Sequence, residues 1–277
     1  AIEFPANIYP WLGLKRLGVD TRLVPAREGR ILIDDLAAAM DDHTRALAIS
    51  WVQFSSGYRS DLAALSELCR GRGAYLIVDA IQGLGALQLD LATLGVDFLC
   101  ADGHKWLLSV EGCAALYVNS RVIGDLTTAN VGWMGMKNCF DFLDYTFRPL
   151  PNARRFEEGS PSVVGIHALG ASVEMFLQAG PAQIEQDILA LTDLLTDRLQ
   201  AIGCTITSPR AAPEKSGILT FTHPKIPSSV LAAALNAQQI ICVDRANNVR
   251  FSPHFYNDET EVAQAVEAVG EAVKSGK

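Results

Sequence analysis

The sequence has no closely spaced cysteines, an excess of acidic residues over basic ones and no long apolar run. Its six cysteines are scattered, with no C-x-x-C pair and no nearby histidine cluster, so we expect reduced thiols and no structural metal. The net charge of −8 disfavours binding to nucleic acid or to an anionic membrane surface. No apolar stretch is long enough to span a membrane, and the first residues do not follow a signal-peptide pattern. The sequence therefore predicts a globular cytoplasmic protein.

The first half of the chain alternates strand-like and helix-like segments. The run AYLIVDA at 74–80 is apolar almost throughout, whereas a half-exposed antiparallel strand would alternate, so it predicts a central parallel strand. Ser60 and Asp61 offer N-caps to a helix over 62–73. Further strands are predicted at 45–52 and at 112–118. The segment LATLGVDFLCA predicts a helical turn followed by another strand. This alternation is typical of an α/β fold, a mostly parallel sheet with helices on its faces.

The second half of the chain changes character near Gly180. Two long helical patterns, at 165–180 and 182–203, flank the Gly180–Pro181 step. Short strands and two more helices follow. We therefore expect a large domain over residues 1–180 and a smaller α+β domain over residues 181–277.

Asp79 ends one predicted strand and Lys105 follows another. Because ligands bind beyond the carboxyl ends of parallel strands, we expect both side chains in one partly dry crevice. Two interpretations are open at this point. The residues form a structural ion pair, or the lysine forms a Schiff base with an aldehyde cofactor while the carboxylate keeps a pyridine nitrogen protonated.

The segment VDAIQGLGALQLDLATLGVDFLCADGHKWL at 78–107 resembles the core of the class V aminotransferase family, fold-type I enzymes that use pyridoxal 5'-phosphate (PLP). Cysteine desulfurases and kynureninases belong to this group, in which D-[AS]-x-Q is followed by a strand and a His-Lys pair. The resemblance implies that Lys105 is the catalytic Schiff-base lysine and that Asp79 pairs with the pyridine nitrogen. It also implies that Gln82 lies near the phenolic oxygen of the cofactor and that His104 binds its phosphate.

Three other segments extend the resemblance. In EFPANIYPW, Phe4 is the candidate for the ring that stacks on the cofactor, with an ordinary core phenylalanine as the alternative. In VGWMG and RRFEEGS, the resemblance implies that Trp133 and Ser160 reach the phosphate in the neighbouring subunit. It therefore implies a homodimer with shared active sites.

The segment VRFSPHFYND at 249–258 matches the family region that holds the substrate carboxylate. Arg250 is the candidate, because its planar guanidinium meets a carboxylate with two hydrogen bonds. Arg245 is a weaker candidate, and a surface arginine at the end of a strand is the alternative. We interpret His254, Tyr256 and Asn257 as packing and turn residues.

The sequence also departs from the family pattern. Cysteine desulfurases carry a nucleophilic cysteine on a loop shortly before the carboxylate-binding arginine, but CVDRANNVR has none in that loop, which argues against desulfurase activity. Asp102 stands where desulfurases often place a phosphate-binding hydroxyl, so we expect it to turn away from the phosphate. Members of the family begin with an N-terminal portion that supplies a phosphate-binding turn, and this sequence starts after it. We therefore interpret the chain as a fragment of a longer enzyme and expect it to bind PLP weakly or not at all.

The resemblance leaves three hypotheses. The first is a PLP-dependent aminotransferase-like enzyme acting on a small amino acid. The second is another PLP reaction, that of a kynureninase-like or sulfur-amino-acid lyase or of an epimerase. The third is a non-catalytic relic that keeps the fold without the cofactor.

Overall fold

The computed structural model describes residues 2–275. The fold has two units, and each unit is built on one β-sheet. The strands of the first sheet are β1 (Ala46–Ser50), β2 (Tyr75–Asp79), β3 (Phe98–Asp102) and β4 (Ala114–Val118). Their order is β1-β2-β3-β4, and β2 pairs in parallel with both of its neighbours. Only β4 runs antiparallel. This arrangement confirms the mostly parallel sheet and the central strand predicted at 74–80.

The helices of this first unit are α1 (Tyr9–Gly13), α2 (Ile33–Ala39), α3 (Leu62–Gly71) and α4 (Val163–Ala179). Helix α3 begins as predicted, because the Asp61 side chain accepts a hydrogen bond from the Ala64 N–H at 3.0 Å. The helical turn expected in LATLGVDFLCA is wrong. Asp90 accepts the Ala92 N–H at 2.9 Å through its side chain, which stabilises a non-helical turn there.

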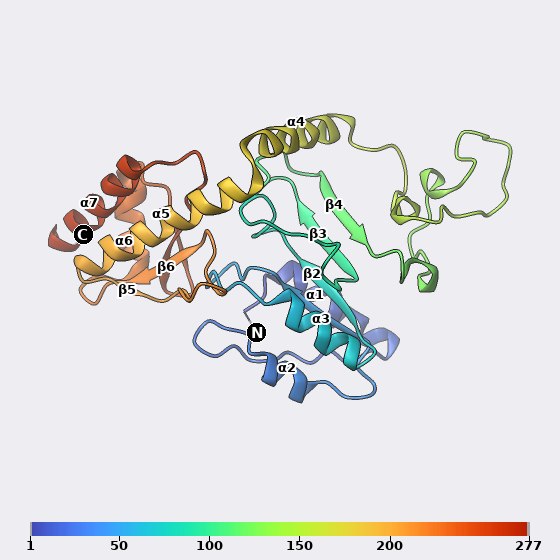
Figure 1. Ribbon diagram of the computed structural model, residues 1–277, viewed down its shortest axis with the longest axis horizontal. Coiled ribbons are helices and arrows are strands. Elements are labelled where there is room, and N and C mark those ends of the chain that lie inside the picture. The colour runs from blue at the N-terminus through green and yellow to red at the C-terminus, as the bar shows by residue number, and fades with distance from the viewer. Residues whose placement is uncertain (1, 276–277) are drawn as a thin grey trace.

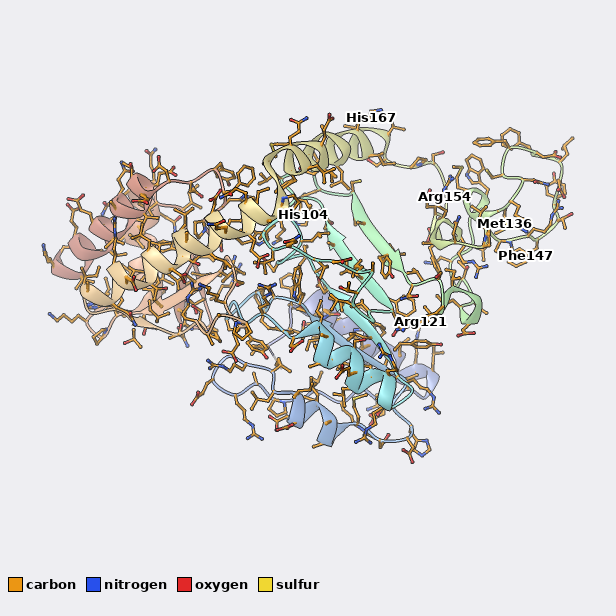
Figure 2. All side chains as sticks on the ribbon, viewed as in Figure 1. His104, Arg121, Met136, Phe147, Arg154 and His167 are labelled. Atoms are coloured by element: carbon orange, nitrogen blue, oxygen red, sulfur yellow. The ribbon has the colours of Figure 1, made fainter. Side chains whose placement is uncertain are left out.

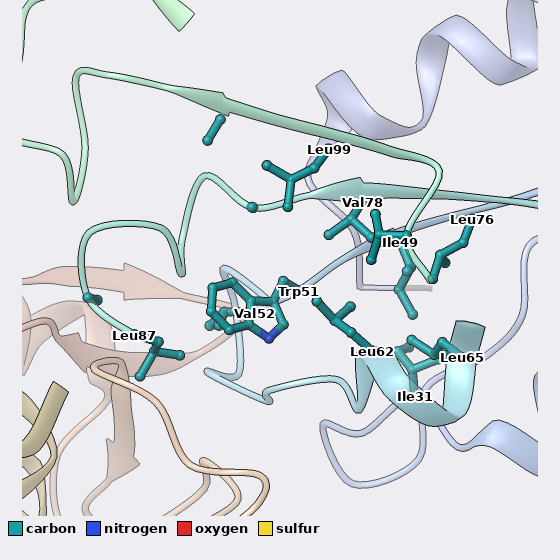
Figure 3. Packing of buried hydrophobic residues seen from close by; sticks show 14 of the residues in the cluster. Ile31, Ile49, Trp51, Val52, Leu62, Leu65, Leu76, Val78, Leu87 and Leu99 are labelled. Carbon is teal, nitrogen blue, oxygen red and sulfur yellow. The ribbon is translucent and has the colours of Figure 1, made fainter. Parts of the chain in front are cut away.

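The core of the first unit is built on alternate residues of β2. Leu76 and Val78 are fully buried, and Figure 3 shows them beside Ile49 of β1 and Leu99 of β3. The indole of Trp51, just after β1, extends this core toward the carboxyl edge of the sheet. The packing therefore continues up to the edge where the candidate residues lie.

The second unit is an antiparallel sheet covered by helices. Its elements are α5 (Pro181–Ala201), β5 (Thr205–Ile206), β6 (Leu219–Thr222), α6 (Ser228–Ala237), β7 (Val243–Arg245), β8 (Asn248–Phe251) and α7 (Glu259–Ser275). The strand order is β5-β6-β8-β7. Strands β7 and β8 are joined by a two-residue turn, and both of its residues, Ala246 and Asn247, have positive φ angles.

Helix α5 connects the two units and contributes to both cores (Figure 1). Ile184 and Ile188 pack into the core of the first unit, whereas Leu191, Leu195 and Leu199 pack into that of the second. The domain boundary predicted at residue 180 stays a prediction. Within residues 2–275 no single helix has the length and apolar character to cross a membrane, and α4 with α5 meets that test only as a pair bent by 81°.

Residues 121–160 form an arm that extends away from the first sheet (Figure 1). The arm contains only short helical turns, among them η4 (Trp133–Gly135) and η5 (Ala153–Phe156). Two segments of the arm lie against each other, because a Cβ on Gly132 would stand 1.6 Å from the Glu158 carbonyl oxygen. Glycine at position 132 therefore allows this close approach.

Because α5 packs into both cores, we predict that truncating Ile188 strongly lowers the free energy of unfolding. Ile188 is fully buried between this helix and the first core. Ile188→Ala should lower the free energy of unfolding by about 2–5 kcal/mol, because it leaves a cavity. Gln186→Ala, on the exposed side of the same helix, is the matched control and should change it by about 0.5 kcal/mol or less. Denaturant unfolding followed by circular dichroism measures both, and equal effects would contradict this packing.

Candidate active site

Three loops meet at the carboxyl edge of the first sheet, one after each parallel strand. The strand register aligns Ser50 with Asp79 and Asp79 with Cys100, so the loops start side by side. A Cβ on Gly83 would lie 2.3 Å from the Trp51 ring, and one on Gly85 would lie 2.4 Å from the Trp106 carbonyl oxygen. Glycines at 83 and 85 therefore let the second loop touch the first and the third.

Asp79 lies at this edge, partly buried and without a cationic partner. Its carboxylate accepts the Ile81 N–H at 3.0 Å, and no salt bridge joins it to another of residues 2–275. Burial raises the pKa of the Asp79 carboxyl and the charge of Glu3 adds to this, while the Ile81 N–H and the Lys105 charge oppose it. Asp79 is therefore a carboxylate that an added cation would stabilise.

Lys105 follows β3 on the third loop. Its electrostatic influence on Asp79 agrees with the expected proximity, but its side chain is exposed. The expectation that the Lys105 side chain lies in a partly dry crevice is therefore wrong. The loop closes through backbone hydrogen bonds that hold Gly103 against Cys113 and Ser109, and it leaves the Lys105 side chain exposed. An ion pair between Asp79 and Lys105 is not among the salt bridges of residues 2–275.

Gln82 and the indole of Trp106 join the second and third loops. The Trp106 Nε1–H donates to Gln82 Oε1 at 2.9 Å, and both residues are buried. His254 of the second unit lies against the same indole, with ring centroids 5.2 Å apart, and its Nε2 lies 3.0 Å from the Trp106 carbonyl oxygen. His254 thus has the packing role expected of it. Through this contact the second unit holds Trp106, the residue that follows Lys105 in the sequence.

His104 pairs with Asp102 on the third loop. His104 Nδ1 lies 2.8 Å from Asp102 Oδ1, and the His104 N–H donates to the same oxygen at 3.3 Å. Figure 2 shows His104 near the junction of α4 with the sheet. Asp102 is thus engaged by its neighbour in sequence.

Phe4 is held near the first loop by the residue before it. Glu3 accepts hydrogen bonds from the Ser50 N–H at 2.9 Å, the Ser50 hydroxyl, the Gln53 amide at 2.5 Å and the Asn7 amide at 2.9 Å. The Phe4 ring meets the Phe54 ring edge-on at 5.3 Å and is about half exposed, so it is not an ordinary core phenylalanine. Sequence reasoning missed Glu3, because its partners lie about 50 residues away.

Arg250 reaches the first unit from β8. Its Nη1–H donates to the Phe54 carbonyl oxygen at 2.6 Å, while its Nε is buried with no partner among residues 2–275. Burial and the nearby Arg245 lower the pKa of Arg250. No carboxylate within residues 2–275 forms a salt bridge with it. Arg250 is therefore not a simple surface arginine, and an anionic ligand would satisfy it.

Trp133 and Ser160 lie elsewhere, on the arm. Figure 2 places Met136, Phe147 and Arg154 of the arm well away from His104. Trp133 is partly exposed and packs against Phe140 and Phe142, and Ser160 is exposed. Within one chain these two residues are not brought to the edge that carries Asp79.

A cavity lies elsewhere in the first unit. It measures about 610 Å³ and lies between β1 and the N-terminal segment, lined among others by Trp11, Leu23 and Leu47. The candidate site is defined by its partly buried charged side chains. Residues 2–275 contain no group of three or more His, Cys, Asp or Glu side chains arranged to hold a metal ion.

Comparison with known proteins matches residues 1–264 to the family model of the aminotransferase class-V proteins. The chain belongs to this family. It is 25% identical to the uncharacterized aminotransferase YcbU of Bacillus subtilis, over 97% of this chain and 70% of that protein. It is 29% identical to the kynureninase of Geobacillus thermodenitrificans, over 96% of this chain and 65% of the relative.

The solved structures agree on the fold. The apo cysteine desulfurase of Thermococcus onnurineus superposes with a TM-score of 0.87 at 22% identity, over 98% of this chain and 70% of the other. The fold-type I architecture expected from the sequence is confirmed. Because class-V aminotransferases are PLP enzymes, family membership also confirms the expected cofactor.

The residues present fit this cofactor. The carboxyl edge offers at Asp79 a partly buried carboxylate without a salt-bridge partner among residues 2–275, to which a protonated pyridine nitrogen would be the counterion. It also offers the exposed amine of Lys105 on the adjoining loop, and the His104 imidazole one residue earlier.

The Glu3 contacts predict that this residue fixes the N-terminal segment. Glu3→Gln should speed hydrogen exchange at the amides of Asn7 and Ile8 by about tenfold, because hydrogen bonds to a charged acceptor contribute about 1.5–3 kcal/mol. Glu28→Gln, at a side chain that is 92% exposed, is the control and should leave that exchange unchanged. Mass spectrometry of exchanged peptides covering residues 2–8 measures the effect, and unchanged exchange in Glu3→Gln would contradict it.

Proposed function

We propose that the protein is a PLP-dependent, aminotransferase-like enzyme that acts on a small amino acid. The observation that carries this proposal is a pair of uncompensated charges of opposite sign, the Asp79 carboxylate and the Arg250 guanidinium. They reach the same edge from different units of the fold. An amino acid bound to PLP carries the complement of both, a pyridinium cation and a carboxylate.

Each residue then has a distinct task. Asp79 would hold the proton on the ring nitrogen of PLP, and His104 would bind the phosphate. Phe4 would cover one face of the ring, and the unused amide N–H groups of Gln82 would donate to the phenolic oxygen. When bound, PLP supplies an electron sink for negative charge on the α-carbon.

Two further residues act on the substrate. Arg250 would bind the substrate carboxylate through the guanidinium edge that contains the unpartnered Nε. The Lys105 amine would remove the proton from the α-carbon and return it, because a group within hydrogen-bond reach of that proton can act as the general base. Where that proton is returned decides the reaction. Return to the cofactor gives transamination.

The structure supports the argument against desulfurase activity. The chain between β7 and β8 is a two-residue turn of Ala246 and Asn247, so it has neither a thiol nor the length of a mobile loop. Cys242, just before β7, is buried and lies 3.8 Å from the Ala232 carbonyl oxygen. Burial raises the pKa of its thiol to about 11, which disfavours the reactive thiolate.

The experiment that tests the proposal is a product panel. Incubation with PLP, a keto acid and each of several small amino acids should yield the corresponding new keto acid. Alanine, sulfide or the opposite enantiomer as main product would assign instead a kynureninase-like lyase, a sulfur-amino-acid lyase or an epimerase. Lys105→Ala should lower the rate by at least about 10³-fold, because the general base is lost.

A spectroscopic control separates binding from turnover. Wild-type protein with PLP should show the visible absorbance change of PLP attached to lysine, and borohydride should fix the cofactor on the Lys105 peptide. Lys105→Arg, which keeps the positive charge, should show neither signal. Full-length protein that captures no PLP would support the non-catalytic relic.

We further propose that the enzyme is a homodimer whose sites are completed by the arm. Phe140, Leu143 and Tyr145 at the tip of the arm are 71%, 83% and 87% exposed, and Val164 at the start of α4 is 77% exposed. Large adjoining apolar side chains on a surface favour association with another protein surface. Trp133 and Ser160 lie on the same arm, which would bring them to the phosphate of a second copy.

Leu143→Asp together with Tyr145→Asp should convert the dimer to a monomer, because it places buried charges at the contact. Light scattering after size exclusion measures the mass. Ile241→Asp, at an 88% exposed residue before β7, is the control and should leave the dimer intact. A chain that is monomeric without any substitution would refute the shared site.

A further inference from the structure

One short segment of the second unit touches two of the three loops at the carboxyl edge. Arg250 on β8 donates to the carbonyl oxygen of Phe54 on the first loop at 2.6 Å. Four residues later, His254 Nε2 lies 3.0 Å from the carbonyl oxygen of Trp106 on the third loop. Trp106 directly follows Lys105 in the sequence. The segment therefore joins the loop before α3 to the loop that carries the lysine.

Hydrogen bonds assign the proton of the His254 ring. Nδ1 accepts the Phe255 N–H at 2.9 Å, so this nitrogen carries no proton. Nε2 faces the Trp106 carbonyl oxygen, which can only accept, so Nε2 carries the proton and donates the hydrogen bond. Burial lowers the pKa of His254, which favours the neutral ring, while the bond to the Trp106 carbonyl opposes this. The contact is therefore a directed hydrogen bond between the two units.

Aromatic packing alone does not require a histidine at position 254. The ring is 4% exposed and stacks on Tyr256 with centroids 5.0 Å apart, and it also lies against Trp106 and Phe176. A phenylalanine would fill this space without burying polar nitrogens, which cost free energy unless they are hydrogen-bonded. What a phenylalanine lacks is the donor toward the Trp106 carbonyl. That donor is what distinguishes histidine at this position.

The chain between Arg250 and His254 is held firmly. Phe251 is buried in the core of the second unit, and the ring of Pro253 restricts the backbone just before His254. The His254 N–H donates to Asn257 Oδ1 at 2.8 Å, and the Asn257 N–H donates to the His254 carbonyl oxygen at 2.9 Å. A displacement of one of the two loop contacts would therefore displace the other.

Lys105 depends on its neighbour in sequence for its position. Its side chain is exposed, so the backbone of the loop places the amine and packing does not. Trp106 fixes that backbone, because its Nε1–H donates to Gln82 and its ring lies 2.5 Å from where a Cβ on Gly217 of the second unit would stand. The hydrogen bond from His254 adds an attachment at the Trp106 carbonyl itself.

We propose that His254 is a positioning residue that attaches the Lys105 loop to the segment carrying Arg250, so that the general base and the carboxylate-binding group keep a fixed spacing. The inference rests on the proposed function, which gives Lys105 and Arg250 their tasks. His254 acts through the Trp106 carbonyl, so no covalent bond changes and no proton is transferred in this role.

Hydrogen exchange tests the attachment without any ligand. The Leu108 N–H donates to the Lys105 carbonyl oxygen at 2.9 Å. The Ser109 N–H donates to the Gly103 carbonyl oxygen at 2.8 Å, so these two amides report on the loop. His254→Phe keeps a ring and removes the donor, and it should speed exchange at both amides by about tenfold, the effect of one hydrogen bond on a local opening equilibrium. His254→Gln, whose amide can donate to the same carbonyl, should stay within about threefold of wild type.

His223→Phe is the matched control. His223 is another buried histidine of the second unit, and its Nδ1 accepts the Lys225 N–H at 3.2 Å within that unit. His223→Phe should therefore leave exchange at Leu108 and Ser109 unchanged. If His254→Phe speeds this exchange no more than His223→Phe does, the inference is overturned and the proposed function still stands.

Turnover by the full-length protein gives a second measurement. His254→Phe should lower kcat by about ten- to a hundredfold and change KM for the amino acid by less than about twofold, because the Arg250 contact with Phe54 remains while the base is misplaced. His254→Gln should recover most of kcat, and His223→Phe should keep the wild-type value. A loss of kcat that His254→Gln does not recover would overturn the inference. Full-length protein that turns over no amino acid, with exchange still faster in His254→Phe, would overturn the proposed function and leave the attachment of the loop standing.

The wild-type ring provides a reading that needs no variant. Nitrogen-15 spectra, assigned through contacts of the His254 ring protons with the Trp106 indole, should show a proton on Nε2 and none on Nδ1 at neutral pH. A proton on Nδ1 alone would leave only lone pairs between Nε2 and the Trp106 carbonyl oxygen, and it would overturn the inference.

Discussion

The parallel pairing of β2 with β1 and β3 is the constraint on which the site depends. It puts the carboxyl ends of three strands on one edge, so Ser50, Asp79 and Cys100 stand in line although they are far apart in sequence. The loops that leave this edge carry the candidate site residues Gln82, His104 and Lys105. Glycines at 83 and 85 allow contact between these loops that no other residue would permit.

Each unit of the fold brings to this edge a charged side chain that has no salt-bridge partner among residues 2–275, and the two charges are of opposite sign. A buried charge without a partner costs free energy, and a ligand that supplies the partner recovers it. Asp79 of the first unit lacks a cation, and Arg250 of the second lacks an anion. Their separate origins mean that a zwitterionic ligand would stabilise the arrangement of the two units as well as bind between them.

Local signals in the sequence predicted much of this arrangement. The apolar run at 74–80 indicated the central strand, Asp61 indicated the start of α3, and the motif around Asp79 and Lys105 indicated the family. These features depend on neighbours in sequence or on a fixed spacing.

Features that depend on distant contacts could not be predicted in this way. Glu3 accepts two hydrogen bonds from Ser50 at the end of β1 and one from Gln53 beyond it, and the link from His254 to Trp106 spans 148 residues. The Asp90 turn replaced a predicted helical turn because a side chain competed for the backbone N–H. The exposure of Lys105 also escaped prediction, because apolar neighbours in sequence do not determine what covers a loop.

The proposed dimer would account for both the exposure of Lys105 and the exposed apolar side chains of the arm. An amine that acts as a general base works best where water is excluded, and this chain leaves Lys105 uncovered. The same chain presents large apolar side chains on an arm that its own core does not use. If the arm of a second copy covers the carboxyl edge, one contact buries the apolar surface, brings Trp133 and Ser160 to the phosphate and shields the lysine from solvent. Each subunit would then depend on its partner for a closed site.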